Sequence, residues 1–352
     1  MEDFRIITNA DLEKWDEFVY NHPAGNIYQT VSWREIIHKA FRHQPIYFVL
    51  ENKNGAIEAA MPFFAVNSKA FGKRLTSLPC AQVCNPLAAR PEGYAAILRH
   101  VYQYIQEKNY PYAELKTNFA IPDIETPITR PFTGYSTYTL DLSDPLEQLE
   151  QSLHKNCIRR AIKKANKLGL NLITGNSIND IKIFYDIYLK MRKAYGLIPQ
   201  PFRFFSEMWK TLHQKQMIEI LHAEYEGTIV SSLVLLKYKN TVTYEYGASL
   251  SNSVHLKPSP FLLWEAIRRA KESGFGVFDF GRTENENEGL STFKKRWNAK
   301  QEILHYYYLP DVHGVSSMRQ TGMAKRMMNY TIKHSPEPVC QLMGNLLYRN
   351  FV

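Results

Sequence analysis

The chain has 352 residues, of which 45% are hydrophobic and 13% aromatic, and this composition excludes an intrinsically disordered protein. The length suits two domains better than a single core. Lys and Arg exceed Asp and Glu by 43 to 34, for a net charge of +9, which favours an anionic partner such as a phosphate-bearing substrate, RNA or an acidic membrane surface. A soluble protein with a basic surface is the alternative.

Periodicity in the first half predicts a strand, two helices, three strands, a longer helix and a short strand. Asn54-Gly55 favours a tight turn between two of the strands, and Ser32 is suitably placed to cap the second helix. In chain order, these elements are expected at residues 4–8, 12–20, 32–40, 46–51, 57–65, 74–78, 92–108 and 112–116.

The second half predicts a strand, three helices, three strands, one more helix and a short strand. Ser259-Pro260 is typical of a helix start, and Gly274 of a helix end. In chain order, these elements are expected at residues 136–142, 145–168, 178–195, 204–214, 218–225, 229–238, 242–247, 261–273 and 277–280.

Both halves therefore contain antiparallel strands that lead into a helix and then a short buried strand. This order is similar to that of a GNAT acetyltransferase domain. We expect an α/β fold with mixed sheets, made of two tandem GNAT-like domains at 1–134 and 135–312 and an amphipathic helical tail at 313–352. The boundary should lie in the Pro- and Thr-rich stretch 121–135.

The predicted helix 145–168 carries a strongly basic segment. Between Gln151 and Asn179 the chain has no acidic residue, and like charges recur four residues apart without a compensating partner on the same helix. A solvated helix face is the simple interpretation, but an unpaired cationic face also suits phosphate oxygens. The cations are Lys155, Arg159, Arg160, Lys163, Lys164 and Lys167.

Two segments resemble the FemA/FemB/FemX-like aminoacyl and acyltransferases, which are built from tandem GNAT domains. The first runs from Asn156 to Gly169 and is similar to the Asn-Ile-Arg-Lys-Ala-x-Lys-x-Gly signature that borders the substrate cleft of that family. The second combines Val277-Phe278-Asp279-Phe280-Gly281-Arg282-Thr283 with Ser291-Thr292-Phe293-Lys294-Lys295-Arg296-Trp297-Asn298-Ala299. The resemblance implies direct transfer of an acyl or aminoacyl group onto a primary amine of a cell-envelope precursor, of the peptidoglycan peptide or glycan type.

The same resemblance implies roles for individual residues. Lys294 follows the aromatic residue of the motif and would stabilise the oxyanion, with Lys295 as the alternative if the register is shifted by one. Arg282 would neutralise phosphate or carboxylate on a substrate. Asp279 is either an orienting carboxylate or a buried partner of Arg282. Lys155, Arg159, Arg160 and Lys163 are the expected phosphate-binding residues.

Aromatic residues around these motifs have two interpretations. Tyr244 and Tyr246 are expected on one face of their strand, where they line an acceptor channel or simply belong to the core. Glu245, on the other face, is a candidate base. Phe293 and Trp297 border the predicted site and are also suitable core aromatics.

The acyl donor is open between aminoacyl-tRNA and acyl-CoA, and we expect no tightly bound cofactor. CoA-dependent GNAT enzymes seat the pyrophosphate on backbone amides at a helix start. Arg90-Pro91-Glu92-Gly93 matches that loop loosely, whereas Lys257-Pro258-Ser259-Pro260 lacks two amides because proline has no N–H. This favours a donor held in another way, and a tRNA donor would also account for the basic segment.

Two other functions stay open. One is a CoA-dependent N-acyltransferase acting on an amino sugar or polysaccharide precursor. The other is a non-catalytic module that binds nucleic acid or a membrane surface, which the tail favours because Met327, Leu342 and Leu346 accompany Arg326 and Lys333.

The sequence contains no apolar run long enough to span a membrane, and Met1-Glu2-Asp3 does not begin a secretory signal. We therefore expect a cytoplasmic protein with possible peripheral contact at the inner membrane surface. The four cysteines are too few for a disulfide framework, and no matching pair accompanies Cys80 and Cys84, so we expect free thiols and no metal site.

Overall fold

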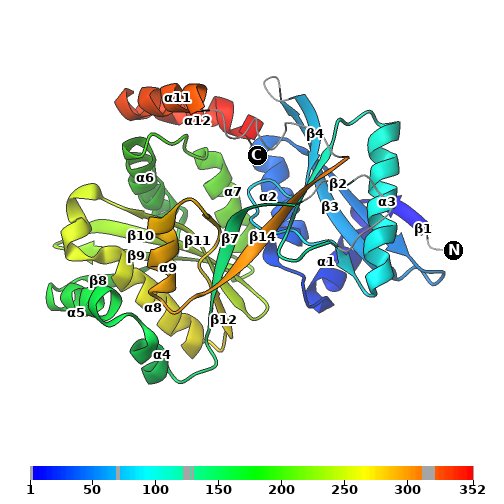
Figure 1. Ribbon diagram of the computed structural model, residues 1–352. Coiled ribbons are helices and arrows are strands. Elements are labelled where there is room, and N and C mark those ends of the chain that lie inside the picture. The colour runs from blue at the N-terminus through cyan, green and yellow to red at the C-terminus, as the bar shows by residue number, and fades with distance from the viewer. Residues whose placement is uncertain (1–2, 69–71, 122–127, 129–130, 311–321, 352) are drawn as a thin grey trace. The chain divides into compact units, whose positions relative to one another are not determined.

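The computed structural model describes residues 3–68, 72–121, 128, 131–310 and 322–351 (Figure 1). The chain divides into two compact units, each assembled from separate stretches. Unit 1 comprises Met1–Tyr135, Ile303–Thr321 and Arg349–Val352, and unit 2 comprises Ser136–Glu302 and Gly322–Tyr348.

Unit 1 contains a mixed sheet in the order β1-β2-β3-β4-β6-β14. Neighbouring strands are antiparallel except β4 and β6, which are parallel and are connected through α3. The strands are β1 (Asp3–Ile6), β2 (Gln44–Glu51), β3 (Ile57–Ser68), β4 (Gly72–Thr76), β5 (Leu87–Ala88, paired with β3), β6 (Ala113–Thr117) and β14 (Lys300–Leu309). The helices are η1 (Asn9–Asp11), α1 (Leu12–Asn21), η2 (Ile27–Gln29), α2 (Val31–Phe41) and α3 (Pro91–Glu107).

Both faces of the unit 1 sheet are covered by helices, as the alternating side chains of β2 show. Tyr47 packs against Trp15 of α1 with ring centroids 4.7 Å apart, and the next residue, Phe48, packs against Tyr104 of α3 at 5.0 Å. Because successive side chains of a strand point to opposite faces, α1 and α3 cover opposite sides of the sheet.

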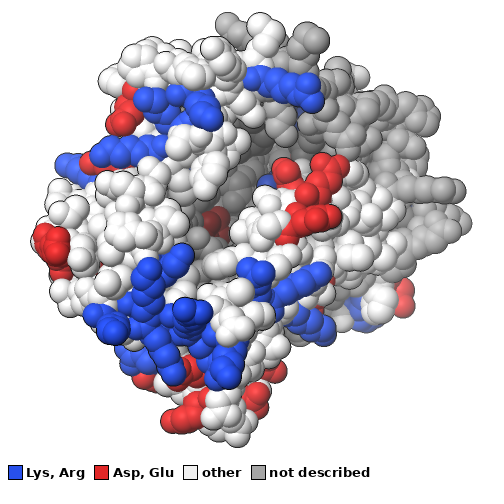
Figure 2. Space-filling view, turned by 60° about the vertical axis from the view of Figure 1, so that its left-hand side comes forward, with Lys and Arg blue, Asp and Glu red and all other residues white. Residues whose placement is uncertain are grey.

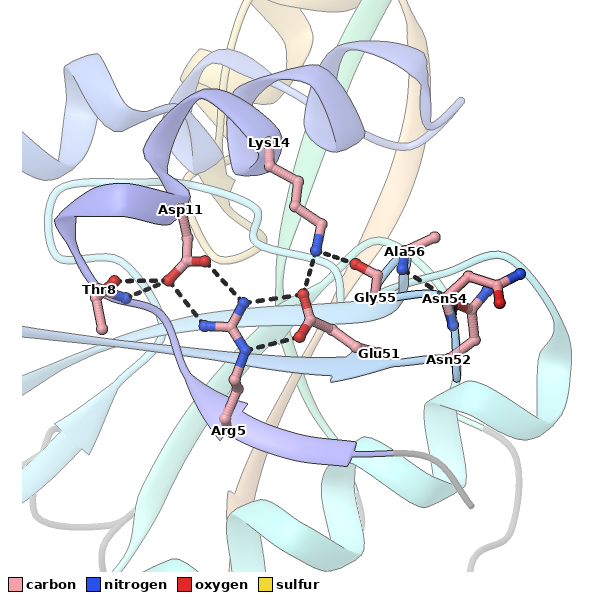
Figure 3. A network of polar contacts seen from close by, with 9 residues as sticks. All are labelled: Arg5, Thr8, Asp11, Lys14, Glu51, Asn52, Asn54, Gly55 and Ala56. Atoms are coloured by element: carbon pink, nitrogen blue, oxygen red, sulfur yellow. Dashed lines mark hydrogen bonds and ion pairs between the residues drawn. The ribbon is translucent and has the colours of Figure 1, made fainter.

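A polar network secures the edge strand β1 (Figure 3). The guanidinium of Arg5 donates to Glu51 at 2.7 Å and to Asp11 at 2.7 Å, and Lys14 pairs with the same Glu51. The hydrogen bonds from Arg5 hold the pKa of the Asp11 carboxyl well below its usual range. The network thereby ties β1, β2 and the start of α1 together.

Unit 2 repeats this topology in the order β7-β12-β11-β10-β9-β8. Here β9, β10 and β11 are antiparallel, α8 follows, and β12 returns parallel to β11. The strands are β7 (Phe132–Asp141), β8 (Asn171–Gly175), β9 (Ile218–Tyr225), β10 (Thr228–Tyr238), β11 (Thr241–Ser249), β12 (Val277–Asp279) and β13 (Thr283–Glu284). The helices are α4 (Leu146–Ser152), η3 (Lys155–Arg159), α5 (Arg160–Lys167), α6 (Ile178–Ala194), α7 (Phe202–Leu212), η4 (Ser251–Leu256), α8 (Pro258–Glu272), α9 (Glu288–Lys295), α11 (Gly322–His334) and α12 (Glu337–Phe351).

Helices cover both faces of the unit 2 sheet. On one face, buried side chains of α5 and α8, among them Ile162 and Leu262, form a core with Leu233 and Leu235 of β10. On the other, Tyr188 of α6 and Phe205 of α7 pack around Tyr246 of β11. The expected mixed α/β fold with a repeated GNAT-like order is confirmed.

The structure differs from the sequence-based prediction in several elements. The helix expected at 145–168 is three pieces, since the chain is extended at Leu153 and η3 is a π-helical turn. Thr30, not Ser32, caps α2, and α8 begins at Pro258 after a left-handed Lys257. The elements β8, β14 and α9 were not predicted.

The units do not follow the expected domain bounds throughout. Residues 305–309 of β14 pair with β6, and 303–309 belong to unit 1, although the sequence interpretation put them in the second domain. Residues 322–348 of the expected tail belong to unit 2. Part of the expected boundary stretch 121–135 and the first residues of the expected tail, 313–321, lie outside the described residues.

Candidate active site

The parallel strands β11 and β12 separate at the end of β12. Their pairing covers Thr241–Thr243 and Val277–Asp279, and β11 then continues to Ser249. After Asp279 the backbone turns through Gly281, whose φ of +74° lies in the left-handed region that favours glycine. After this turn, β13 pairs with β7.

Asp279 is fixed by hydrogen bonds at this turn. Its Oδ1 accepts from the N–H of Gly281 at 2.8 Å and from the hydroxyl of Thr137, on β7, at 3.1 Å. Burial raises the pKa of the Asp279 carboxyl, and the hydrogen bond from Gly281 and the nearby Lys294 oppose that rise. The carboxylate therefore orients the turn from within β12.

Lys294 is buried, with only 3% of its surface exposed. From the last turn of α9 its Nζ donates to the carbonyl oxygens of Gly281 at 2.6 Å and Arg282 at 3.3 Å, and lies 5.3 Å from the centre of the Tyr138 ring. An ammonium group has three N–H donors, so one is not used by these two carbonyls. Burial lowers the pKa of Lys294 to about 8, although Asp279 partly offsets the effect.

The other predicted residues of this motif are less enclosed or belong to the core. Lys295 and Arg282 are exposed. Trp297 is fully buried in the core of unit 2, and Phe293 is half-buried and packs against that core. The simple interpretation as core aromatics thus describes the environment of both rings.

Tyr244 and Tyr246 do not share a face of β11, contrary to the expectation. A β-bulge places Glu245 as an extra residue, because Tyr244 pairs with Leu235 while Tyr246 pairs with Val234. Tyr244 packs against the α8 side of the core, where burial raises its pKa to about 12. Tyr246 packs instead between α6 and α7, so the two rings cannot line one channel wall.

The basic segment lies on the surface of unit 2. Lys155, Arg160 and Lys163 are exposed, as are Lys164 and Lys167, while Ala161, Ile162 and Ala165 are buried beneath them. Figure 2 shows Lys and Arg side chains gathered on the face that comes forward when the α5 side of Figure 1 is turned to the viewer. Arg159 is half-buried, and its Nε makes no hydrogen bond within the described part of the chain.

A backbone hydrogen bond joins the basic segment to the helix that carries Lys294. The N–H of His154, directly before η3, donates to the carbonyl of Arg296, directly after α9, at 2.9 Å. The imidazole Nδ1 of His154 also accepts from the N–H of Cys157 at 3.3 Å and so caps η3. The start of the cationic segment and the end of α9 are therefore neighbours.

The helix starts offer few amide donors to a phosphate. At the start of α8, Pro258 and Pro260 have no N–H, and the N–H of Phe261 donates to the backbone carbonyl of Lys257 at 3.3 Å. Within the first four residues this leaves the N–H of Ser259. At the start of α3, Pro91 removes one amide, and the N–H of Gly93 donates to Arg90 at 3.0 Å.

Sequence reasoning missed the residues that hold the site together. Thr137 and Tyr138 lie on β7 and the hydroxyl of Tyr138 lies 2.5 Å from that of Ser291 on α9. Their only sequence signal was the alternation of polar and apolar residues along β7.

Among the described residues, no group of three His, Cys, Asp or Glu could hold a metal ion, and no helix is long and apolar enough to cross a bilayer.

Helices on both faces of a mixed sheet whose two parallel strands separate at one end are features of the GNAT class of acyltransferase fold. Residues 152–295 match the family model of the acetyltransferase (GNAT) domain. A crystal structure of FemX has a TM-score of 0.70 at 14% identity, covering 90% of this chain and 99% of that one.

Relatives that are similar in sequence include two transferases. Over 304 residues the chain is 24% identical to the UDP-N-acetylmuramoylpentapeptide-lysine N(6)-alanyltransferase of Weissella viridescens, covering 80% of this chain and 88% of that relative. Over 92 residues it is 31% identical to a lipid II:glycine glycyltransferase of Staphylococcus epidermidis, and this match covers 24% of this chain and 22% of that relative. The GNAT match, the FemX fold and these sequence similarities support the resemblance to FemAB-like transferases that the sequence indicated.

Proposed function

We propose that this chain transfers an aminoacyl group onto a primary amine of a peptidoglycan precursor. The observation that carries the proposal is the similarity to an alanyltransferase over 80% of this chain and 88% of that relative. That relative acts, by its name, on the lysine of a UDP-linked muramoyl pentapeptide, whose diphosphate is anionic. A cationic surface joined to a buried lysine suits such a substrate.

Lys294 would act at the carbonyl of the donor. The neutral amine of the acceptor attacks the carbonyl carbon of the aminoacyl ester, and a C–N bond forms. The carbonyl oxygen becomes negative and accepts a hydrogen bond from the N–H of Lys294 that the two backbone carbonyls do not use. The C–O bond to the ribose then breaks, the alkoxide takes a proton, and the amine nitrogen releases one to solvent or a base. The two backbone carbonyls that hold Nζ keep the ammonium in place, so no reorganisation is required during the reaction.

We propose aminoacyl-tRNA as the donor. The start of α8, where the GNAT fold would seat a pyrophosphate, has two prolines and one amide not used within the helix, which disfavours CoA. The exposed cations of η3 and α5 suit a polyphosphate backbone, because each neutralised phosphate releases counterions.

The test measures transfer with three donors: alanyl-tRNA, glycyl-tRNA and acetyl-CoA. The acceptor is UDP-linked muramoyl pentapeptide, and product is followed by mass spectrometry. We expect an added amino acid with a charged tRNA, loss of product after ribonuclease treatment, and no acetylated product. Acetylation of the acceptor, with thermal stabilisation of the protein by CoA, would instead support the CoA-dependent alternative and would contradict the proposed donor.

A further inference from the structure

The C-terminal helices α11 and α12 use one stripe of apolar side chains to dock on unit 2. Ile332 of α11 and Cys340 of α12 are fully buried, and they pack with Leu189 of α6 and with Ile198 in the loop after it. Met328, Met343, Leu347 and Tyr348 support the same cluster. These contacts account for the positions of the two helices against α6.

A second apolar stripe remains in solvent. The exposed fractions are 67% for Met327 and 68% for Tyr330 of α11, and 56% for Leu342 and 61% for Leu346 of α12, with Val339 at 42%. Spacings of three and four residues put each set on one side of its helix. Because the buried stripes face α6, the exposed stripes face away from it.

The residue that follows α6, Tyr195, is exposed beside this surface. Gly196 approaches the backbone of Asn329 so closely that a Cβ there would lie 2.5 Å from the Asn329 carbonyl oxygen. Tyr195, the preceding residue, is 70% exposed. Together with the helical stripes it forms what we term the tail surface: Tyr195, Met327, Tyr330, Val339, Leu342 and Leu346.

Charge around the tail surface is positive. Arg326, Lys333 and Arg349 are exposed on the same two helices, and Glu337, which is half-buried, is the one acidic residue in the sequence from 322 to 352. A second copy of the chain would bring like charges together, which disfavours self-association through this face. Aliphatic side chains such as Leu342 and Leu346 offer no partner to nucleic-acid phosphates, so a tRNA is not the expected occupant.

We propose that α11 and α12 dock the protein on an anionic lipid bilayer. Apolar side chains flanked by Lys and Arg are the features of a helix that lies in a membrane interface, and tyrosine is favoured at that depth because its ring is apolar and its hydroxyl polar. The apolar stripe enters the headgroup region, and the cations contact lipid phosphates. The inference does not depend on transferase chemistry, because docking is measured without substrates.

The test is co-sedimentation of the full-length protein with vesicles of phosphatidylglycerol and phosphatidylcholine, or of phosphatidylcholine alone. We expect binding to the anionic vesicles, weakened by salt, and about tenfold or more loss of binding for Leu342→Glu combined with Leu346→Glu. Tyr20→Glu is the matched control, because Tyr20 is 59% exposed on α1 of unit 1, and it should bind as wild type.

Further measurements separate the rival occupants. Arg326→Gln with Lys333→Gln should lower binding and its salt dependence, whereas Lys53→Gln, at an exposed turn of unit 1, should not. Circular dichroism and thermal unfolding confirm that each variant is folded. The proposal fails if wild type does not bind anionic vesicles, or if the Leu342/Leu346 variant binds them equally. It also fails if wild type is a dimer that this variant converts to monomers, since the occupant is then a second copy.

Discussion

Burial makes Lys294 different from the lysine next to it. Lys294 is held by two carbonyl oxygens and has a pKa near 8, whereas Lys295 points to solvent. In a site with little water, a fixed positive group stabilises developing negative charge more strongly than the same group in solution. Adjacent residues of one type therefore allow a direct comparison of two environments.

Lys294→Met should lower turnover by about a hundredfold to a thousandfold, the usual effect of removing one oxyanion donor. It should also cost about 1–3 kcal/mol of unfolding free energy, because the Gly281 and Arg282 carbonyls lose their partner. Lys295→Met should change stability by no more than about 0.5 kcal/mol and leave turnover near wild type. Steady-state kinetics and denaturant unfolding measure both. If Lys294→Met keeps wild-type turnover, the lysine only fastens the turn after β12.

Activity should fall as pH rises through about 8, the pKa of Lys294. The protonated amine stabilises an oxyanion by its hydrogen bond and its positive charge, and the neutral amine has lost that charge. Stability should respond with the opposite sign. Between about 8 and the usual pKa of lysine, the unfolded chain binds more protons at this residue than the folded one, so the unfolding free energy contributed here rises with pH. Lys294→Met should abolish that rise in pH-dependent unfolding relative to Lys295→Met. Deprotonation of the acceptor amine also makes activity rise with pH, so the falling limb is assigned by comparison with Lys294→Met. A falling limb that persists in this variant would contradict the role of Lys294.

At the scale of elements, one extra residue and one break in a helix decide the site. Glu245 was expected on the face of β11 opposite to two tyrosines, but as a bulge residue it reverses the alternation, and Tyr246 joins the α6 and α7 cluster. At Leu153 the chain leaves the helical path, and this places the His154 N–H against the Arg296 carbonyl. Both features depend on partners distant in sequence.

The contrast shows what periodicity could and could not predict. Strands β9, β10 and β11 and helix α6 agree with prediction to within about two residues, because long patterns of buried side chains record which face is covered. The short helix α9 could not be recognised, since it has little more than two turns and its apolar residues are few. Lys294 was selected by resemblance to a family motif, whereas its two carbonyl partners come from a loop thirteen and twelve residues earlier.

Neutralising the basic segment should weaken donor binding without unfolding the protein. Lys155→Gln, Arg160→Gln and Lys163→Gln remove exposed charges, so stability should stay within about 0.5 kcal/mol, while KM for charged tRNA rises and kcat changes little. Each lost phosphate contact should reduce the slope of log affinity against log salt by about one in filter binding. Lys190→Gln is the control, since Lys190 is exposed on α6, which covers the other face of the sheet. Equal salt slopes for control and triple variant would exclude phosphate contacts by this segment.

At the scale of the molecule, unit 1 depends on a strand that the chain supplies late. Residues 305–309 of β14 pair with β6, and three consecutive tyrosines of β14 are at most 4% exposed. The Tyr306 hydroxyl donates to the Gln82 carbonyl at 3.1 Å, and that of Tyr307 accepts from the Ile121 N–H at 2.9 Å. Unit 1 is therefore incomplete until residues 303–309, which follow the first stretch of unit 2, have been made.

Residues 1–135 expressed alone should consequently fail to form a stable domain. Fully burying an aromatic side chain contributes about 1.5–3 kcal/mol, so losing the three tyrosines of β14 removes much of the 5–15 kcal/mol that stabilises a typical domain. We expect weak near-ultraviolet circular dichroism and a broad unfolding transition for the fragment. Joining residues 300–310 to its end through a flexible Gly/Ser linker should restore cooperative unfolding, because β6 regains its antiparallel neighbour. The same linker followed by a scrambled 300–310 sequence controls for added length. Cooperative unfolding of residues 1–135 by themselves would mean that β14 is an accessory strand and that unit 1 is complete without it.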